Sequence, residues 1–104
     1  MICHSTDSTF TNDVRSEGLT LVNFWAPWCG PCRMFGSVLE DYDTTQREDV
    51  RIVKINVDEH EQVSSHYGVM SLPTTILFKD GKPVDKEIGY MSKVALTAWV
   101  SSNR

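Results

Sequence analysis

The sequence has no apolar run that approaches the ~20 residues needed to span a bilayer as a helix. Residues 1–7 have neither the basic start nor the apolar stretch of a secretory signal. An excess of basic residues is also missing, since 14 acidic and 10 basic side chains give a formal net charge of −4. We therefore expect a cytoplasmic protein whose main partners are neither nucleic acids nor anionic membranes.

The chain is also short and poor in cysteine. With 104 residues it has room for one hydrophobic core, so we expect a single domain over residues 1–104. Apolar residues make up 40% of the chain and charged residues 23%, which is typical of a globular protein. Three cysteines, an odd number without an export signal, do not form a disulfide framework. They indicate either a metal site or redox chemistry.

Five segments have the composition of β-strands: residues 2–5 weakly, and residues 19–25, 50–57, 74–78 and 84–88. The second and third are apolar enough to be covered on both faces of a sheet. Asp80-Gly81 lies between the last two segments and is a strong signal for a hairpin. We therefore expect those two strands to be antiparallel neighbours.

Four segments have helical patterns: residues 8–15, residues 32–47 (from Cys32 to about Arg47), residues 59–67 and the segment after Ser92. The second follows Gly30-Pro31, where proline fits an early helical position. The third should be capped by Asp58 and closed by Gly68. Ser92 can cap the last helix.

The order of these elements predicts the fold class. Strands alternate with helices, and the chain ends in a hairpin followed by a final helix. We expect an α/β fold with a central mixed sheet of four to five strands, flanked by helices on both faces.

Cys29 and Cys32 lie three residues apart, where a buried strand ends and the long helix begins. A helix N-terminus presents unpaired N–H groups and the positive end of the helix dipole, and both stabilise a thiolate. The thiolate is the nucleophile in disulfide exchange. Cys29 can attack a target disulfide, and Cys32 can then resolve the mixed disulfide. We expect Cys29 to be exposed and Cys32 to be half buried.

A zinc site is the alternative interpretation of the two cysteines. Structural zinc needs four ligands, and a single Cys-x-x-Cys pair supplies two. The remaining candidates are Cys3 and the three histidines, His4, His60 and His66. Gly-Pro between the cysteines at a helix start fits a redox site better. We therefore expect no metal and no bound cofactor, only a redox-active disulfide between Cys29 and Cys32.

Several segments together resemble the thioredoxin family. The segment Phe24-Trp-Ala-Pro-Trp-Cys-Gly-Pro-Cys32 is similar to the active-site segment of thioredoxins. Further family motifs follow in order: Lys54-Ile-Asn-Val-Asp58, Tyr67-Gly68-Val69, Leu72-Pro73-Thr74, Phe78-Lys-Asp-Gly81 and Gly89. The resemblance covers essentially the whole chain. It implies the thioredoxin fold and a thiol-disulfide oxidoreductase, a dithiol carrier that reduces disulfides in client proteins.

The resemblance also implies partners and further site residues. A thioredoxin reductase, an NADPH-dependent flavoprotein in the family, would recharge the cysteine pair of a monomeric chain. Pro73 matches a proline that thioredoxins hold in cis opposite the cysteines, which would put the Leu72 backbone beside Cys29, ready to pair with a substrate strand. The surface that contacts clients would comprise Trp28, Gly30, Pro31, Leu72, Pro73, Thr74, Ile88, Gly89 and Tyr90.

Asn23 departs from the family pattern. Thioredoxins usually carry a buried aspartate here, which is thought to accept the proton of the resolving cysteine together with a lysine that matches Lys54. An amide does not titrate, and it removes the like-charge repulsion that raises a nearby thiol pKa. Resolution through Cys32 should then depend on water, on Lys54 if its pKa is lowered, or on the leaving thiolate. Alternatively, Asn23 fills the position with a satisfied hydrogen bond and avoids a desolvation cost.

The long helix departs from the family as well. Ser37 stands where thioredoxins usually have a proline that kinks this helix. Gly/Ser pairs are among the known causes of kinks, so Gly36-Ser37 predicts a milder bend.

Two other functions stay open. A thiol-disulfide isomerase or oxidant of the superfamily generally has a histidine before the second cysteine, where this chain has Pro31. A redox-independent interaction module using the same fold would show loss of the cysteines, and both are present.

Cys3, on the first predicted strand, is expected to be an inert and partly buried residue.

Overall fold

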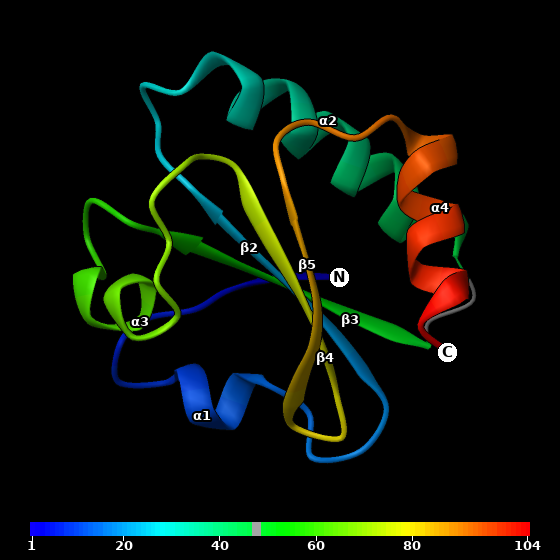
Figure 1. The fold of residues 1–104 in the computed structure, drawn as a ribbon, viewed down its shortest axis with the longest axis horizontal. Helices are drawn as coiled ribbons and strands as arrows, with labels where there is room; N and C mark the ends of the chain where they lie inside the picture. Colours follow the sequence, from blue (N-terminus) through cyan, green and yellow to red (C-terminus); the bar gives the residue numbers. More distant parts are fainter. Residues whose placement is uncertain (47–48) are drawn as a thin grey trace.

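The structure is a computed structural model that describes residues 1–46 and 49–104. Within them the chain forms a central sheet with helices on both faces (Figure 1). The elements follow in the order β1 (Ile2–His4), α1 (Phe10–Asp13), β2 (Leu19–Trp25), α2 (Gly30–Thr45), β3 (Val50–Asn56), α3 (Glu61–His66), β4 (Thr74–Lys79), β5 (Lys82–Ile88) and α4 (Lys93–Ser102). No helix of the described residues is long and apolar enough to cross a membrane.

The sheet is mixed, and its strand order is β1-β3-β2-β4-β5. Strands β1, β3 and β2 run parallel, whereas β4 is antiparallel to both β2 and β5. The predicted hairpin is therefore confirmed. Its turn places Asp80 at φ 52° and Gly81 at φ 84°, the left-handed backbone that an Asp-Gly pair adopts readily.

Strand β2 lies at the centre of the sheet, and its side chains alternate between two hydrophobic cores. One core lies between the sheet and helices α2 and α4, and it includes Leu19, Leu21, Phe35, Leu39, Ile52, Leu77, Leu96 and Val100. The other lies on the opposite face, against α1 and α3, and it includes Phe10, Val22, Phe24, Val53, Ile55, Val63, Ile76 and Phe78. Burial on both faces explains why β2 is apolar almost throughout.

Three predicted helices have different bounds in the structure, and one of them, α3, covers Glu61–His66 rather than residues 59–67. Helix α2 begins at Gly30 rather than Cys32, and it ends at Thr45 with Gln46 as its C-cap. The predicted end near Arg47 lies outside the described residues. Helix α1 covers four residues, Phe10–Asp13, instead of residues 8–15. The ends of such short helices are poorly marked in a sequence.

The expected cap of α3 by Asp58 is wrong. The carboxylate of Asp7 takes this place, accepting hydrogen bonds from the backbone N–H of Val63 at 2.9 Å and of Gln62 at 3.4 Å. These partners lie more than fifty positions away from Asp7, so no local sequence pattern reveals the cap. At the other end of the helix Gly68 adopts φ +65°, and its predicted closing role is confirmed.

Helix α4 is capped at its start and bonded to the sheet near its end. The Ser92 hydroxyl accepts a hydrogen bond from the Ala95 backbone N–H at 3.1 Å, which confirms the predicted cap. At the C-terminal end, the carboxylate of Asp85 on β5 accepts from Trp99 Nε1 at 2.8 Å and from Asn103 Nδ2 at 3.0 Å. Asp85 thus links the edge strand to the last helix.

These bonds should make stability depend on the ionisation of Asp85. Hydrogen bonds from Asn103, from the Lys86 backbone and from Trp99 hold the pKa of the Asp85 carboxyl below its usual value. A lowered folded-state pKa gives stability that is present above the unfolded pKa of ~3.9 and is lost as the pH falls through the folded value. We expect Asp85→Asn to lower the urea midpoint at neutral pH, and to lower it less at about pH 2.5.

Glu17→Gln provides the matched control, because it removes one negative charge at an exposed position. Its urea midpoint should follow the parent at both pH values. If the Asp85→Asn midpoint differed from the parent by the same amount at both pH values, the ionisation of Asp85 would not contribute to stability.

Candidate active site

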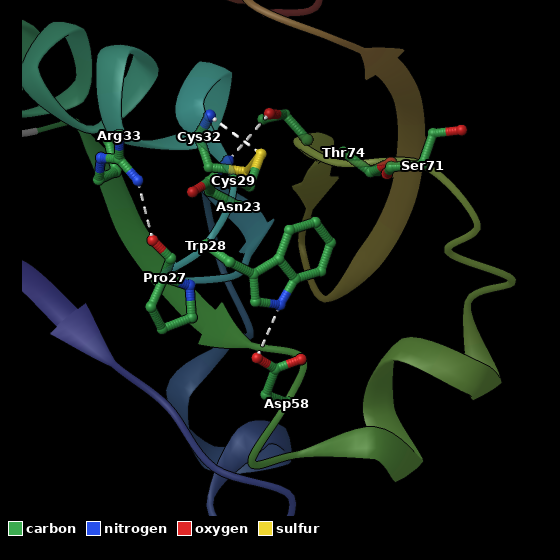
Figure 2. The surroundings of a disulfide bond; sticks show 10 residues. Asn23, Pro27, Trp28, Cys29, Cys32, Arg33, Asp58, Ser71 and Thr74 are labelled. Atoms are coloured by element: carbon green, nitrogen blue, oxygen red, sulfur yellow. Dashed lines mark hydrogen bonds between the residues drawn. A yellow bond between two sulfur atoms is a disulfide. The ribbon is translucent and has the colours of Figure 1, made fainter.

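Cys29 occupies the N-cap of helix α2, directly after the turn that follows β2. The backbone N–H of Cys32 donates a hydrogen bond to the Cys29 sulfur at 3.2 Å. Figure 2 shows this contact and the disulfide that joins the two cysteines, whose Cα atoms are 5.2 Å apart. The sequence thus places a sulfur where unpaired N–H groups and the helix dipole favour negative charge, so the arrangement suits a thiolate at Cys29 once the disulfide is reduced.

The exposure predicted for the two cysteines is wrong in degree. Cys29 is 6% exposed and Cys32 is 2% exposed, so both are buried, although their expected order is kept. The disulfide packs with Ala26 and is covered by the partly buried side chains of Val57 and Leu72. The sequence could not show this burial, because the covering residues come from the loops after β3 and before β4.

A groove of about 570 Å³ borders the site, and Cys29 is one of its lining residues. We call this the α3 groove; it is lined by Trp28, Cys29, Val57, Asp58, Glu61, Ser64, Ser65, Val69, Met70 and Leu72. Cys32 does not belong to the lining. Of the two cysteines, Cys29 is therefore the one that lies at the open groove.

The bond between Leu72 and Pro73 is cis, as the sequence comparison with thioredoxins implied. Two hydrogen bonds fix the loop around it: the Gly89 N–H donates to the Pro73 carbonyl at 2.8 Å, and the Thr74 hydroxyl donates to the Ser71 carbonyl at 2.6 Å. Leu72 contacts the cysteine cluster. The loop before β4 and the end of β5 are thereby brought to the cysteine pair.

The residues expected to contact clients differ in how much surface they expose. Trp28 is 69% exposed, Ile88 61% and Tyr90 47%, so these three side chains offer the most apolar surface of the set. Pro31 is also exposed, and Gly30, Leu72 and Gly89 are partly exposed. Pro73 and Thr74 are buried, so their side chains offer clients little contact.

Asp58 is a neighbour of the site that the sequence did not reveal in this role. Its carboxylate accepts a hydrogen bond from Trp28 Nε1 at 2.9 Å (Figure 2). This bond fixes the orientation of an indole that is otherwise largely exposed. No sequence pattern predicted the hydrogen bond between Trp28 and Asp58, because the two residues meet only when β2 and β3 pair.

Asn23 is 1% exposed and belongs to the surroundings of the disulfide drawn in Figure 2. Its Nδ2 donates to the Thr75 hydroxyl at 3.5 Å, a long contact. Its Oδ1 has no hydrogen-bond partner among the described residues. The alternative that Asn23 is fully satisfied by hydrogen bonds therefore holds for one side of the amide only.

Lys54 lies opposite Asn23 in the pairing of β2 with β3. Its ammonium is 4.6 Å from the centroid of the Trp25 ring, and a side chain at Gly36 of α2 would meet it at 3.4 Å. Burial lowers the pKa of the Lys54 amine, and the charge of Glu40 opposes this in part. Because the ammonium is the flexible end of a long side chain, Lys54 does not by itself require glycine at position 36, and the bend at Gly36-Ser37 stays a prediction.

The remaining candidates lie away from the pair. Cys3 is partly buried on β1, and burial together with the nearby Asp13 raises the pKa of its thiol. His66 is exposed on α3, whereas His60 precedes that helix and accepts a long hydrogen bond from the Asp7 N–H at 3.4 Å. In the part of the chain that the structure describes, no group of three or more His, Cys, Asp or Glu side chains could hold a metal ion.

Comparison with known proteins agrees with this geometry. The Thioredoxin family model matches residues 1–102. The chain belongs to the thioredoxin family. It is 44% identical over 102 residues to the thioredoxin of Bacillus subtilis (strain 168), covering 98% of this chain and 97% of that protein. It is also 46% identical over 93 residues to the thioredoxin of Alicyclobacillus acidocaldarius, with 89% of each chain covered, and 47% identical over 96 residues to that of Listeria monocytogenes, with 92% of each covered.

Family membership and the bonded cysteines together identify a dithiol redox carrier of the thioredoxin type, a protein-disulfide oxidoreductase. The thioredoxin fold expected from the sequence is confirmed. The redox-active group is the Cys29–Cys32 disulfide itself. Thioredoxins work between reductases and proteins with disulfides, which are the general partners of this chain.

The amide at position 23 makes a test of proton handling possible. We expect Asn23→Asp to add a second ionisation to the pH–rate profile of disulfide exchange, and to move thiolate formation to higher pH. The reason is that a buried carboxylate repels a nearby thiolate and titrates itself. Stopped-flow rates over a pH series would measure both effects.

Asn12→Asp is the matched control, since it makes the same chemical change at an exposed position. Its profile should coincide with that of the parent. Identical profiles for Asn23→Asp and the parent would show that the residue at position 23 does not affect the exchange.

Proposed function

We propose that this chain is a single-domain thioredoxin, residues 1–104, that reduces disulfides in client proteins with Cys29 as nucleophile and Cys32 as resolving cysteine. The observation that supports these roles is the placement of the two sulfurs. Cys29 caps helix α2 and lines the open α3 groove, whereas Cys32 lies inside the first turn of the helix and is more deeply buried. A nucleophile needs both access and a stabilised thiolate.

The reaction follows from this placement in two exchanges. The Cys29 thiolate attacks one sulfur of a client disulfide, the client S–S bond breaks, and the other client sulfur leaves as a thiolate. Cys32 then attacks the Cys29 sulfur, the mixed disulfide breaks, and the second client sulfur leaves. Two electrons pass to the client, and the Cys29–Cys32 disulfide is formed.

Clients would dock on the exposed surface that surrounds Cys29. Trp28, Ile88 and Tyr90 supply apolar area, and exposed apolar area of this kind usually marks a contact surface. The backbone at Leu72 would pair with an extended client segment, as in strand addition to a sheet edge. Gly30, Pro31 and Gly89 complete the proposed contact region, and the buried Pro73 and Thr74 would contribute through their backbone.

The resolving step has an unusual proton environment for a thioredoxin. Asn23 cannot accept the proton of Cys32, because its amide does not titrate. Lys54 is the titratable group that lies opposite Asn23 in the pairing of β2 with β3, and burial lowers the pKa of its amine. We assign Lys54, water or the leaving client thiolate as the acceptor.

The electron donor would be a thioredoxin reductase, an NADPH-dependent flavoprotein in this family, acting on a monomeric chain in the cytoplasm. The formal net charge of −4 favours protein clients over nucleic acids or anionic membranes as partners. An isomerase or oxidant would differ in reduction potential, which a redox titration measures. An interaction module would work without its cysteines.

Insulin reduction in the presence of dithiothreitol tests the proposed function. We expect the parent to accelerate the reaction well above the uncatalysed background, and Cys29→Ser to return it to that background, because the nucleophile is lost. Cys3→Ser is the control and should keep the parent rate. Equal rates for the parent and Cys29→Ser would favour the interaction module.

A second test separates the two cysteines. Cys32→Ser removes the resolving sulfur, so client proteins should accumulate as mixed disulfides with Cys29 that are released by excess thiol. Cys29→Ser should trap none of them. Adduct formation through Cys32 in place of Cys29 would reverse the proposed roles, and gel analysis without and with reductant would show it.

A further inference from the structure

The sulfur atoms of the three cysteines and four methionines differ in how open they are to a small oxidant. In the disulfide form Cys29 and Cys32 are bonded to each other and buried. The Cys3 thiol is partly buried, and burial raises its pKa, so little of the reactive thiolate is present. The methionine thioethers are therefore the sulfur atoms that remain open to oxidation in this form.

The four methionines are exposed to very different degrees. Met70 is 95% exposed and Met34 61%, whereas Met91 is partly buried against the core beneath α2 and α4. Met1 is fully exposed and is the first residue of the chain. Oxidation of a thioether needs direct contact with the oxidant, so we expect it to follow exposure. Among the methionines that follow Met1, Met70 is the most open to an oxidant.

Met70 lies in the segment that leads from α3 to the cis Leu72-Pro73 bond. It lines the α3 groove together with Cys29, and no other methionine is among the described lining residues. The loop that follows is fixed by the hydrogen bond from the Thr74 hydroxyl to the Ser71 carbonyl at 2.6 Å. A fixed loop thus holds one flexible apolar side chain at the groove of the reactive cysteine.

The Met70 side chain contributes little to the stability of the fold, because at 95% exposure it buries almost no surface within the chain. Methionine is flexible and polarisable, and surfaces that accept varied partners often use it. Trp28, which is 69% exposed, lines the same groove. A client that enters this groove to reach Cys29 therefore meets the Met70 thioether.

We propose that Met70 is a site of oxidation by hydrogen peroxide, and that its sulfoxide weakens the docking of client proteins at Cys29. The second part rests on the proposed function, because it concerns only clients that Cys29 attacks. In the reaction the thioether sulfur attacks one peroxide oxygen, the O–O bond breaks and an S–O bond forms. The second oxygen takes up the proton of the first and leaves as water. The sulfur is oxidised, and the peroxide is reduced, by two electrons.

The sulfoxide changes the polarity of the surface next to Cys29. An oxygen that needs hydrogen bonds replaces an apolar thioether, so a client that covers it loses free energy of binding. The Cys29–Cys32 disulfide itself is unchanged by this reaction. We therefore expect slower exchange with proteins that dock on the groove, and an unchanged rate with a small thiol that needs no docking.

Peptide mapping by mass spectrometry tests the first part. The disulfide form of the full chain is treated with graded hydrogen peroxide, and the peroxide is then removed. We expect one added oxygen on Met70 at doses that leave Met34 mostly unmodified and Met91 intact, in the order of their exposure. Oxidation of Met34 before Met70, or to the same extent, would overturn the assignment.

The rate of insulin reduction by the treated and then reduced protein tests the second part. We expect peroxide to lower it about fivefold in the parent, as loss of part of one methionine contact would give. The rate at which dithiothreitol reduces the Cys29–Cys32 disulfide should not change. Met70→Leu keeps the apolar volume and should keep its insulin rate after treatment. Met34→Leu is the matched control, because Met34 is exposed but lies outside the groove lining, and it should lose activity as the parent does.

Met70→Gln tests the docking role without any oxidant, because its amide places a polar group at a similar distance from the backbone. It should reduce insulin more slowly than the parent, whereas Met34→Gln should keep the parent rate. An unchanged insulin rate after complete oxidation of Met70, or an equal loss in treated Met70→Leu, would overturn the docking role. Failure of the proposed function looks different, since the untreated parent would then not reduce insulin while the mapping would still identify the oxidised methionine.

Discussion

Cys29 ends the turn after β2 and caps helix α2, where its sulfur accepts a hydrogen bond from the Cys32 N–H. This contact needs β2 at the centre of the sheet, buried on both faces, so that its end is held rigidly. It also needs a helix that begins at Gly30, because the unpaired N–H groups of the first turn favour a thiolate. The chemistry of the chain depends on this one junction.

Segments that are distant in sequence complete the site around the junction. The cis Leu72-Pro73 bond and the end of β5 lie against the pair, and the Gly89 N–H donates to the Pro73 carbonyl. Asp58 orients Trp28 from the loop after β3. Asp7 caps α3 from the loop after β1, so the N-terminal segment positions the wall of the α3 groove. The reactive pair lies at one helix end, whereas the residues around it come from several loops.

Patterns confined to a few neighbouring residues predicted the structure best. Asp80-Gly81 marked the hairpin, Ser92 the cap of α4 and Gly68 the end of α3, because each depends on backbone preferences within one turn. Wrong predictions arose where a distant group decided the outcome. Asp58 had the right spacing to cap α3, but its carboxylate bonds to Trp28 and Asp7 caps the helix. The burial of Cys29 depends likewise on Val57 and Leu72.

The sequence by itself determined the fold class, the family and the two reactive cysteines, since periodicity, turn residues and the Cys-Gly-Pro-Cys spacing are properties of short segments. Tertiary structure decided how far the disulfide is buried, how Asn23 is paired and which side chains line the groove at Cys29. The physical reason is that burial, desolvation and charge–charge interactions act across space. They are fixed only when strands β2, β3 and β4 pair and bring their loops together.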